Sequence, residues 1–223
     1  MFDMKLASMI DHTLLKLGST KDELKKVCDE AKQYNFATVC VYSNNIEFVA
    51  NELKGSNVKP IAVVGFPTGL VSTNEKVTET KSAVSAGAKE IDMVINKKEL
   101  AAKKYKFVFE DIKEVVDAAK TNPVKVIIET CDLNNDEKII ACALSKAAGA
   151  AFVKTSTGFS KSGATVEDVA LMRRIVGSDM GVKASGGIRT NEDAVAMINA
   201  GATRIGASAS IAIVTGGKGE GKY

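Results

Sequence analysis

Two lysines lie inside short apolar segments of this sequence, where a charged side chain is unusual. Lys154 ends residues 151–154, and Lys183 lies within residues 182–184. Lysine is rarely buried unless a partner compensates its charge, because removing an ammonium group from water is costly. Most other lysines fit an ordinary solvated surface, so we interpret these two as functional and keep a structural ion pair as the alternative.

An acid occupies a segment of the same kind. Asp92 lies between Ile91 and Met93, and the two-residue period of a strand places Asn96 on the same face. Asp92 fits a buried salt bridge as well as it fits a role in proton transfer. If this acid and the two lysines share one site, they predict catalysis by an amine.

The chemistry that two amines and a carboxylate support is Schiff-base formation. A free lysine has a pKa of about 10.4, so very little of it is neutral at pH 7. A second ammonium group and partial desolvation lower that pKa toward about 7. The neutral amine attacks a carbonyl carbon, and the resulting iminium withdraws electrons from the neighbouring C–C bond. A carboxylate then serves to move protons.

Glycines follow the last two apolar segments. Gly186-Gly187 comes just after the Lys183 segment, and Gly206-Ala207-Ser208 ends the final one. In barrel enzymes the loops after strands seven and eight often bind phosphate through backbone N–H groups. Ordinary turns are the alternative for each motif alone, but the two together predict a phosphate site.

Three further polar residues are weaker candidates. His12 beside Asp11 is the only histidine, and we interpret it as packing or as a hydrogen-bonding support. Cys40 is interpreted as a small core residue. Glu129 ends another apolar segment, where it either lines the pocket or neutralises a lysine.

The elements that position these residues alternate along the chain. Short β-branched segments are followed by amphipathic stretches, which begin with pairs such as Thr20 and Glu23 that satisfy free N–H groups at a helix start. Ala-Gly-Ala triplets end several of these stretches, as expected of a left-handed glycine after a helix. The expected strands are residues 38–42, 61–65, 91–95, 124–129, 151–154, 182–184 and 203–206, and residues 10–14 are a further strand or the end of a helix.

Alternation of strands and helices predicts an α/β fold with a parallel sheet. Seven or eight such units predict a closed (β/α)8 TIM barrel, a single domain over residues 1–215, followed by a flexible glycine-rich tail over residues 216–223. An open doubly wound sheet is the alternative, but no GxGxxG motif follows an early strand. In a barrel, active residues lie at the C-terminal ends of the strands, as Lys154 does.

Composition excludes several classes of function. One histidine rules out zinc sites with two or three histidines, and the four arginines and the net charge of +3 argue against nucleic-acid binding. No apolar run reaches the roughly 18 residues of a membrane span. Four cysteines without a CxxC pair predict reduced thiols in the cytoplasm. We expect neither a metal nor a cofactor.

Several segments together resemble the deoxyribose-phosphate aldolase family, over about residues 10–214. The segments that carry the resemblance are Ile10-Asp11-His12-Thr13, Val39-Cys40-Val41-Tyr42, Gly65-Phe66-Pro67, and residues 90–96, 152–159 and 182–189. The resemblance implies a metal-free class I aldolase on a (β/α)8 barrel. Its reaction would be the reversible cleavage of 2-deoxy-D-ribose 5-phosphate to acetaldehyde and D-glyceraldehyde 3-phosphate, in deoxynucleoside breakdown. Family members commonly form homodimers.

The resemblance also implies roles for individual residues. Lys154 matches the Schiff-base lysine, and Asp92 the acid that shuttles protons. Lys183 matches the second lysine, which lowers the pKa of the first and takes part in proton transfer. Tyr223 resembles a C-terminal tyrosine that carries protons in some members. Thr157 matches a polar residue near the substrate. The matching phosphate-binding positions are Gly186, Gly187, Gly206 and Ser208.

Two positions depart from the family pattern. Ala209 stands where many members carry a serine, and Phe159 where some carry a lysine. The phosphate would then be held mainly by backbone dipoles and by Arg189. A transaldolase or a fructose-bisphosphate-type aldolase is an alternative that keeps the amine chemistry, and a phosphate-binding barrel without lysine chemistry is an alternative of another class.

Overall fold

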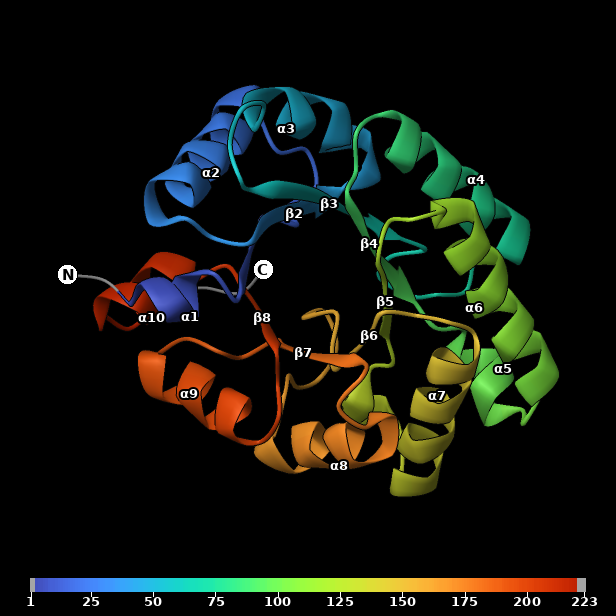
Figure 1. Ribbon diagram of the computed structural model, residues 1–223. Helices are drawn as coiled ribbons and strands as arrows, with labels where there is room; N and C mark the ends of the chain where they lie inside the picture. The colour runs from blue at the N-terminus through green and yellow to red at the C-terminus, as the bar shows by residue number, and fades with distance from the viewer. Residues whose placement is uncertain (1–2, 220–223) are drawn as a thin grey trace.

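The β-branched segments form eight parallel strands that close into a barrel in chain order, with β1 paired to both β2 and β8 (Figure 1). The computed structural model describes residues 3–219. The predicted closed (β/α)8 barrel is therefore confirmed, and residues 10–14 contribute a strand. The strands are β1 Ile10–Thr13, β2 Thr38–Tyr42, β3 Lys59–Val64, β4 Glu90–Val94, β5 Val124–Ile127, β6 Phe152–Lys154, β7 Gly181–Ser185 and β8 Arg204–Ala207.

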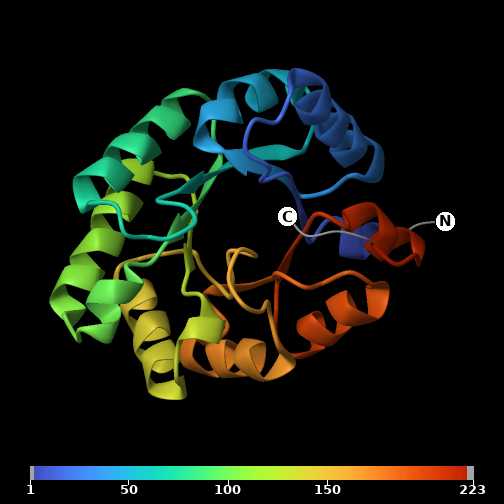
Figure 2. The same ribbon diagram turned by 180° about the vertical axis from the view of Figure 1, so that it is seen from behind.

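Helices form a ring around the barrel, as Figures 1 and 2 show from opposite sides. Several begin where a side chain caps free N–H groups, and Thr20 with Glu23 forms the predicted capping box at the start of α2. The helices are α1 Met4–Ala7, α2 Lys21–Tyr34, α3 Ile46–Glu52, α4 Thr73–Ser85, α5 Lys97–Ala101, α6 Tyr105–Ala119, α7 Asn135–Ala147, α8 Val166–Val176, α9 Asn191–Asn199 and α10 Ser210–Thr215.

Apolar packing is divided between the outside and the inside of the barrel. The main core lies between the strands and the surrounding helices. A small separate cluster lies within the barrel, where Cys40, Ile61 and Val63 from β2 and β3 pack with Leu15. The remaining strands fill the interior with charged side chains, and these build the site described below.

Differences at two of the expected strand ends bear on candidate residues. Strand β4 ends at Val94, and Asn96 caps helix α5 by accepting a 3.1 Å hydrogen bond from the N–H of Glu99. Asn96 therefore does not share the strand face of Asp92, because the chain turns out of the sheet before it. Strand β5 ends at Ile127, and Glu129 adopts a left-handed conformation with φ of 57°.

The boundary expected at residue 215 coincides with the end of α10. Beyond it, Gly217 donates a 2.9 Å backbone hydrogen bond to Ala212, and Gly219 donates one of 2.9 Å to Arg189. The tail is thus held against the barrel as far as residue 219, and flexibility over residues 216–223 stays a prediction. Across residues 3–219, none of the helices combines the length and apolar character needed to cross a membrane.

Candidate active site

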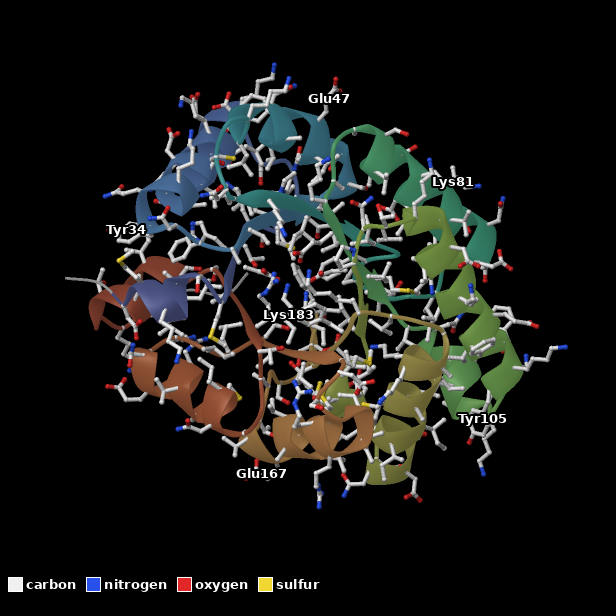
Figure 3. The ribbon with its side chains drawn as sticks, in the orientation of Figure 1. Tyr34, Glu47, Lys81, Tyr105, Glu167 and Lys183 are labelled. Carbon is white, nitrogen blue, oxygen red and sulfur yellow. The ribbon has the colours of Figure 1, made fainter. Side chains whose placement is uncertain are left out.

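Three strands bring the two predicted lysines and the predicted acid into direct contact. The Nζ atoms of Lys154 and Lys183 lie 2.9 and 2.7 Å from the same oxygen of Asp92, Oδ2. Lys154 is the last residue of β6 and Lys183 its register partner in β7. All three side chains are buried, and Lys183 lies at the centre of the barrel (Figure 3).

A third lysine completes the surroundings of Asp92. Lys125 in β5 is fully buried, and its Nζ lies 2.9 Å from the other oxygen of Asp92, Oδ1, and 2.5 Å from Oε2 of Glu90. Sequence reasoning missed Lys125 as a site residue. The signal was present, since Lys125 interrupts an apolar strand as Lys154 does, but no loop with catalytic character follows it.

Two more residues extend the cluster toward the N-terminal ends of the strands. Oδ2 of Asp11 lies 2.5 Å from Nζ of Lys183, and Nη1 of Arg204 lies 2.7 Å from Oδ1 of Asp11. Arg204 also contacts Glu90 at 3.1 Å. We define the charged cluster as Asp11, Glu90, Asp92, Lys125, Lys154, Lys183 and Arg204, which is four cationic residues and three acids.

Within the cluster the lysines differ in proton affinity. Burial lowers the pKa of Lys154, the charge of Lys183 lowers it further, and Asp92 opposes both without reversing the shift. Burial also acts on Lys183 and Lys125, but their acidic neighbours outweigh it and raise the pKa of each. Lys154 is therefore the lysine that most readily supplies a neutral amine.

The acids of the cluster are held as carboxylates. Burial alone would raise the pKa of Asp92, yet Lys125, Lys154 and Lys183 together hold it well below its usual range. The pKa of Asp11 is likewise lowered, since Lys183, Lys125 and Arg204 outweigh its burial. Asp92 is thus ready to accept a proton rather than to donate one.

Cys40 faces the cluster from strand β2. Burial raises the pKa of its thiol to about 11, with Asp92 adding to the shift. It therefore remains a neutral thiol near pH 7, in keeping with its interpretation as a small core residue.

A cavity of about 430 Å³ lies beside the cluster, between the loops that follow β6, β7 and β8. Three of the residues expected to bind phosphate, Gly186, Gly187 and Ser208, line it, and so do Arg189 and Lys161. Both glycines have positive φ, 82° and 77°, which glycine adopts without strain. The lining combines the backbone of glycines, the hydroxyl groups of Ser160, Ser162 and Ser208, and two cationic side chains, which suits a phosphate group.

The loop after β6 is packed tightly onto the loop after β7. A Cβ atom on Gly163 would lie 2.0 Å from the carbonyl oxygen of Gly186, and Ala164 donates 3.1 Å backbone hydrogen bonds to both Ser185 and Gly186. The loops after β6 and β7, which form two walls of the cavity, are therefore in direct backbone contact, with no side chain between them.

Thr157 lies in a neighbouring hollow rather than in the lining of that cavity. Its hydroxyl group donates a 2.5 Å hydrogen bond to Oε2 of Glu129, and its backbone N–H lies 3.2 Å from Oε1. Its hydroxyl oxygen also accepts a 3.1 Å hydrogen bond from the N–H of Phe159. Glu129, which is buried, thus orients Thr157 and does not neutralise a lysine of the cluster.

Two predicted residues stand apart from the others. Gly206 lies in β8 outside the cavity lining, and a Cβ atom there would be 2.8 Å from Cε of Lys183. The absence of a side chain at Gly206 therefore leaves room for Lys183, a role that the sequence did not indicate. Tyr223 lies outside the described residues. Over residues 3–219, the structure groups no three His, Cys, Asp or Glu side chains in a way that could hold a metal ion.

Comparisons with known proteins give the site a context. The sequence matches a family model described as DeoC/LacD family aldolase over residues 5–216. It is 56% identical over 220 residues to the deoxyribose-phosphate aldolase of Streptococcus sanguinis, covering 99% of this chain and 100% of that one. The enzyme of the same name from Clostridium novyi is 58% identical over 218 residues, 97% of this chain and 98% of the other. The tetrameric deoxyribose phosphate aldolase of Aeropyrum pernix superposes with a TM-score of 0.88 at 32% identity, covering 95% of this chain and 90% of that one.

Proposed function

This chain belongs to the DeoC/LacD family of aldolases, and from that premise we propose that it reversibly cleaves 2-deoxy-D-ribose 5-phosphate to acetaldehyde and D-glyceraldehyde 3-phosphate. The observation that carries the proposal is the pair of lysines on one carboxylate oxygen, in which Lys154 has the lowered pKa and Lys183 the raised one. That pairing supplies a nucleophilic amine next to a permanent ammonium group.

The neutral Nζ of Lys154 attacks C1 of the open-chain sugar, and loss of water from the adduct leaves an iminium. The C2–C3 bond then breaks, and its electron pair forms the C1=C2 bond of an enamine on Lys154. At the same time the C3 hydroxyl group loses its proton, and C3 becomes the aldehyde carbon of D-glyceraldehyde 3-phosphate. Protonation of C2 and hydrolysis of the iminium release acetaldehyde and regenerate the amine.

Asp92 moves the proton in this scheme, and Lys183 supports the transfer as a fixed positive charge. When Lys154 becomes an iminium, it has fewer N–H groups to donate to Asp92. A lone pair on Oδ2 of Asp92 is then available to accept the proton of the C3 hydroxyl group. Lys183 stays bound to both Asp92 and Asp11 and holds a positive charge beside the reacting atoms. Asp92 returns the proton when C2 of the enamine is protonated.

The cavity beside the cluster accommodates the phosphate end of the sugar. Gly186, Gly187 and Ser208 supply backbone and hydroxyl contacts, and Arg189 and Lys161 supply positive charge. Thr157 accepts from a sugar hydroxyl group, because its own hydrogen is committed to Glu129. Gly219, held to Arg189, leaves four residues to Tyr223, and that length of chain spans at most about 14 Å. We include Tyr223 in the proposal as a proton carrier.

Deoxynucleoside breakdown in the cytoplasm, without a metal or cofactor, is part of the same proposal. So is self-association, since the Aeropyrum pernix relative is tetrameric. Sedimentation velocity of the purified chain measures the assembly, and a monomer at all concentrations contradicts that part.

Trapping with borohydride tests the nucleophile, the substrate and the class of reaction together. Incubation with acetaldehyde and borohydride is expected to add a two-carbon group to Lys154, located by peptide mass spectrometry. The Lys154→Ala variant is the control and should show no label at that peptide. Labelling of another lysine instead of Lys154 would exclude the proposed mechanism, and labelling with dihydroxyacetone in preference to acetaldehyde would favour a transaldolase-type substrate.

A further inference from the structure

We propose that His12, acting through Ser210, is a positioning residue for the turn that binds the substrate phosphate, and that it does so by donating a hydrogen bond from Nδ1 to the hydroxyl oxygen of Ser210. The inference rests on the proposed function, because the phosphate is taken to occupy the cavity beside the turn. It concerns a residue that contacts neither the charged cluster nor that cavity.

The turn in question, residues 207–210, forms a thin wall between two hollows. Ala207, Ser208 and Ala209 line the phosphate cavity on one side. Ser208 and Ala209 also line a second hollow of about 370 Å³ on the other side, between helices α2 and α10. A wall with space on both faces requires support from its own hydrogen bonds if Ser208 is to keep its position.

Ser210 provides that support from the outer side. Its side chain is fully buried, and its hydroxyl group donates a 2.9 Å hydrogen bond to the carbonyl oxygen of Ala207 across the turn. The same hydroxyl oxygen lies 2.9 Å from Nδ1 of His12. His12 is itself buried in β1 and packs against the ring of Phe36.

The number of hydrogens decides the protonation state that completes these bonds. Nε2 of His12 lies 3.0 Å from Glu30, and this hydrogen bond holds the pKa of Glu30 below its usual value, so Glu30 accepts and Nε2 carries a hydrogen. Ser210 has one hydroxyl hydrogen and two possible acceptors, Nδ1 and the oxygen of Ala207. Only if Nδ1 also carries a hydrogen are all three bonds formed at once. A neutral His12 would compete with Ala207 for the Ser210 hydrogen and loosen the turn.

The charged groups around His12 favour a hydrogen on each of its two ring nitrogens. Helix α2 presents Glu30 and, further along the same hollow, Glu23 and Lys26, whose Nζ lies 3.9 Å from Glu30. Helix α10 carries no charged residue. Asp11, the neighbour of His12 in β1, belongs to the charged cluster and contacts Lys183 on the other face of the strand. Glu30 is thus the charged group that His12 contacts directly.

The test separates the two nitrogens of His12. His12→Asn keeps an N–H donor near the position of Nδ1, whereas His12→Gln keeps one near the position of Nε2 and loses the bond to Ser210. Ser210→Ala removes the support altogether. Ser145→Ala is the matched control, because Ser145 is equally buried and also donates to a carbonyl, that of Ala141, but in helix α7. Each variant is assayed with 2-deoxyribose 5-phosphate and with unphosphorylated 2-deoxyribose.

We expect KM for the phosphorylated substrate to rise about fivefold in Ser210→Ala and His12→Gln, the effect of one net hydrogen bond, with little change in kcat. His12→Asn should retain most of the preference for the phosphorylated sugar.

Equal losses with both sugars would show a general structural role and overturn the inference, as would an unchanged preference in Ser210→Ala and His12→Gln. Binding of inorganic phosphate, followed by calorimetry, gives the same comparison without any aldolase chemistry. If acetaldehyde fails to label Lys154 in the natural protein, the proposed function fails. If it labels Lys154 in every variant while phosphate affinity stays constant, only the role of His12 fails.

Discussion

Replacing Lys183 by methionine removes one charge from the centre of the site while keeping the length of the side chain. The Nζ atoms of Lys154 and Lys183 bind the same oxygen of Asp92 at 2.9 and 2.7 Å. At a separation of roughly 5 Å and an effective dielectric constant of about 20, two ammonium groups repel by about 3 kcal/mol. Lys183→Met abolishes this repulsion, so the pKa of Lys154 rises and less neutral amine is present at pH 7.

We therefore expect kcat/KM at pH 7 to fall about a hundredfold or more, since each ~1.4 kcal/mol is tenfold in rate. Because the reactive form of Lys154 is the deprotonated one, the acidic limb of the pH–rate profile should move to higher pH, and activity should recover in part as the pH is raised. The assay is acetaldehyde release from 2-deoxyribose 5-phosphate between about pH 6 and pH 10.

Lys125→Met is the matched control for this variant. Lys125 is equally buried and binds the same carboxylate, but through Oδ1, whereas Lys183 shares Oδ2 with Lys154. Its loss should therefore displace the acidic limb less than the loss of Lys183 does. If Lys183→Met loses activity without any displacement of the limb, or if both variants displace it equally, the electrostatic reasoning is wrong.

Three further results are expected. Lys76→Met should lower the free energy of unfolding, measured by urea titration, by about 3–5 kcal/mol. The reason is that the buried Asp111, which lies 2.6 Å from Nζ of Lys76, would lose its cation. A loss under about 1 kcal/mol would contradict this. Glu129→Ala should raise KM for the sugar phosphate through loss of the Thr157 orientation, and Glu129→Gln, which keeps an acceptor, should restore it. Dialysis against a chelator should leave turnover unchanged. If dialysis abolishes the activity and added metal restores it, the metal-free mechanism is refuted.

The sequence predicted the barrel and its strands well because strand and helix periodicity is local. Lys154, Lys183 and Asp92 could be selected for a similar reason, since each is a charge within an apolar segment. The misplacement of Asn96 has the opposite origin. Extending the strand period by two residues ignored the helix cap at Asn96, whose side chain is a good N-cap acceptor.

Three other members of the charged cluster, Asp11, Glu90 and Arg204, could not be identified from the sequence. Glu90 and Arg204 are the first residues of β4 and β8, where polar residues are ordinary at the start of a strand. Their contact depends on closure of the barrel, which brings β1, β4 and β8 around one axis. Asp11 meets Lys183 and Arg204 only because β1 pairs with β8, a pairing of residues nearly 200 positions apart.

The imbalance of charge in the cluster explains why Lys154 is the lysine of the cluster with the lowered pKa. Four cationic residues face three buried acids, so one positive charge lacks a counterpart in a region with little water. Lys125, Lys183 and Arg204 each contact two or more of these acids, whereas Lys154 contacts only Asp92, and it shares that oxygen with Lys183. The least costly way to remove the excess charge is therefore to deprotonate Lys154. A buried ion-pair network usually contributes little to stability, but here its excess of one cation favours the neutral form of Lys154.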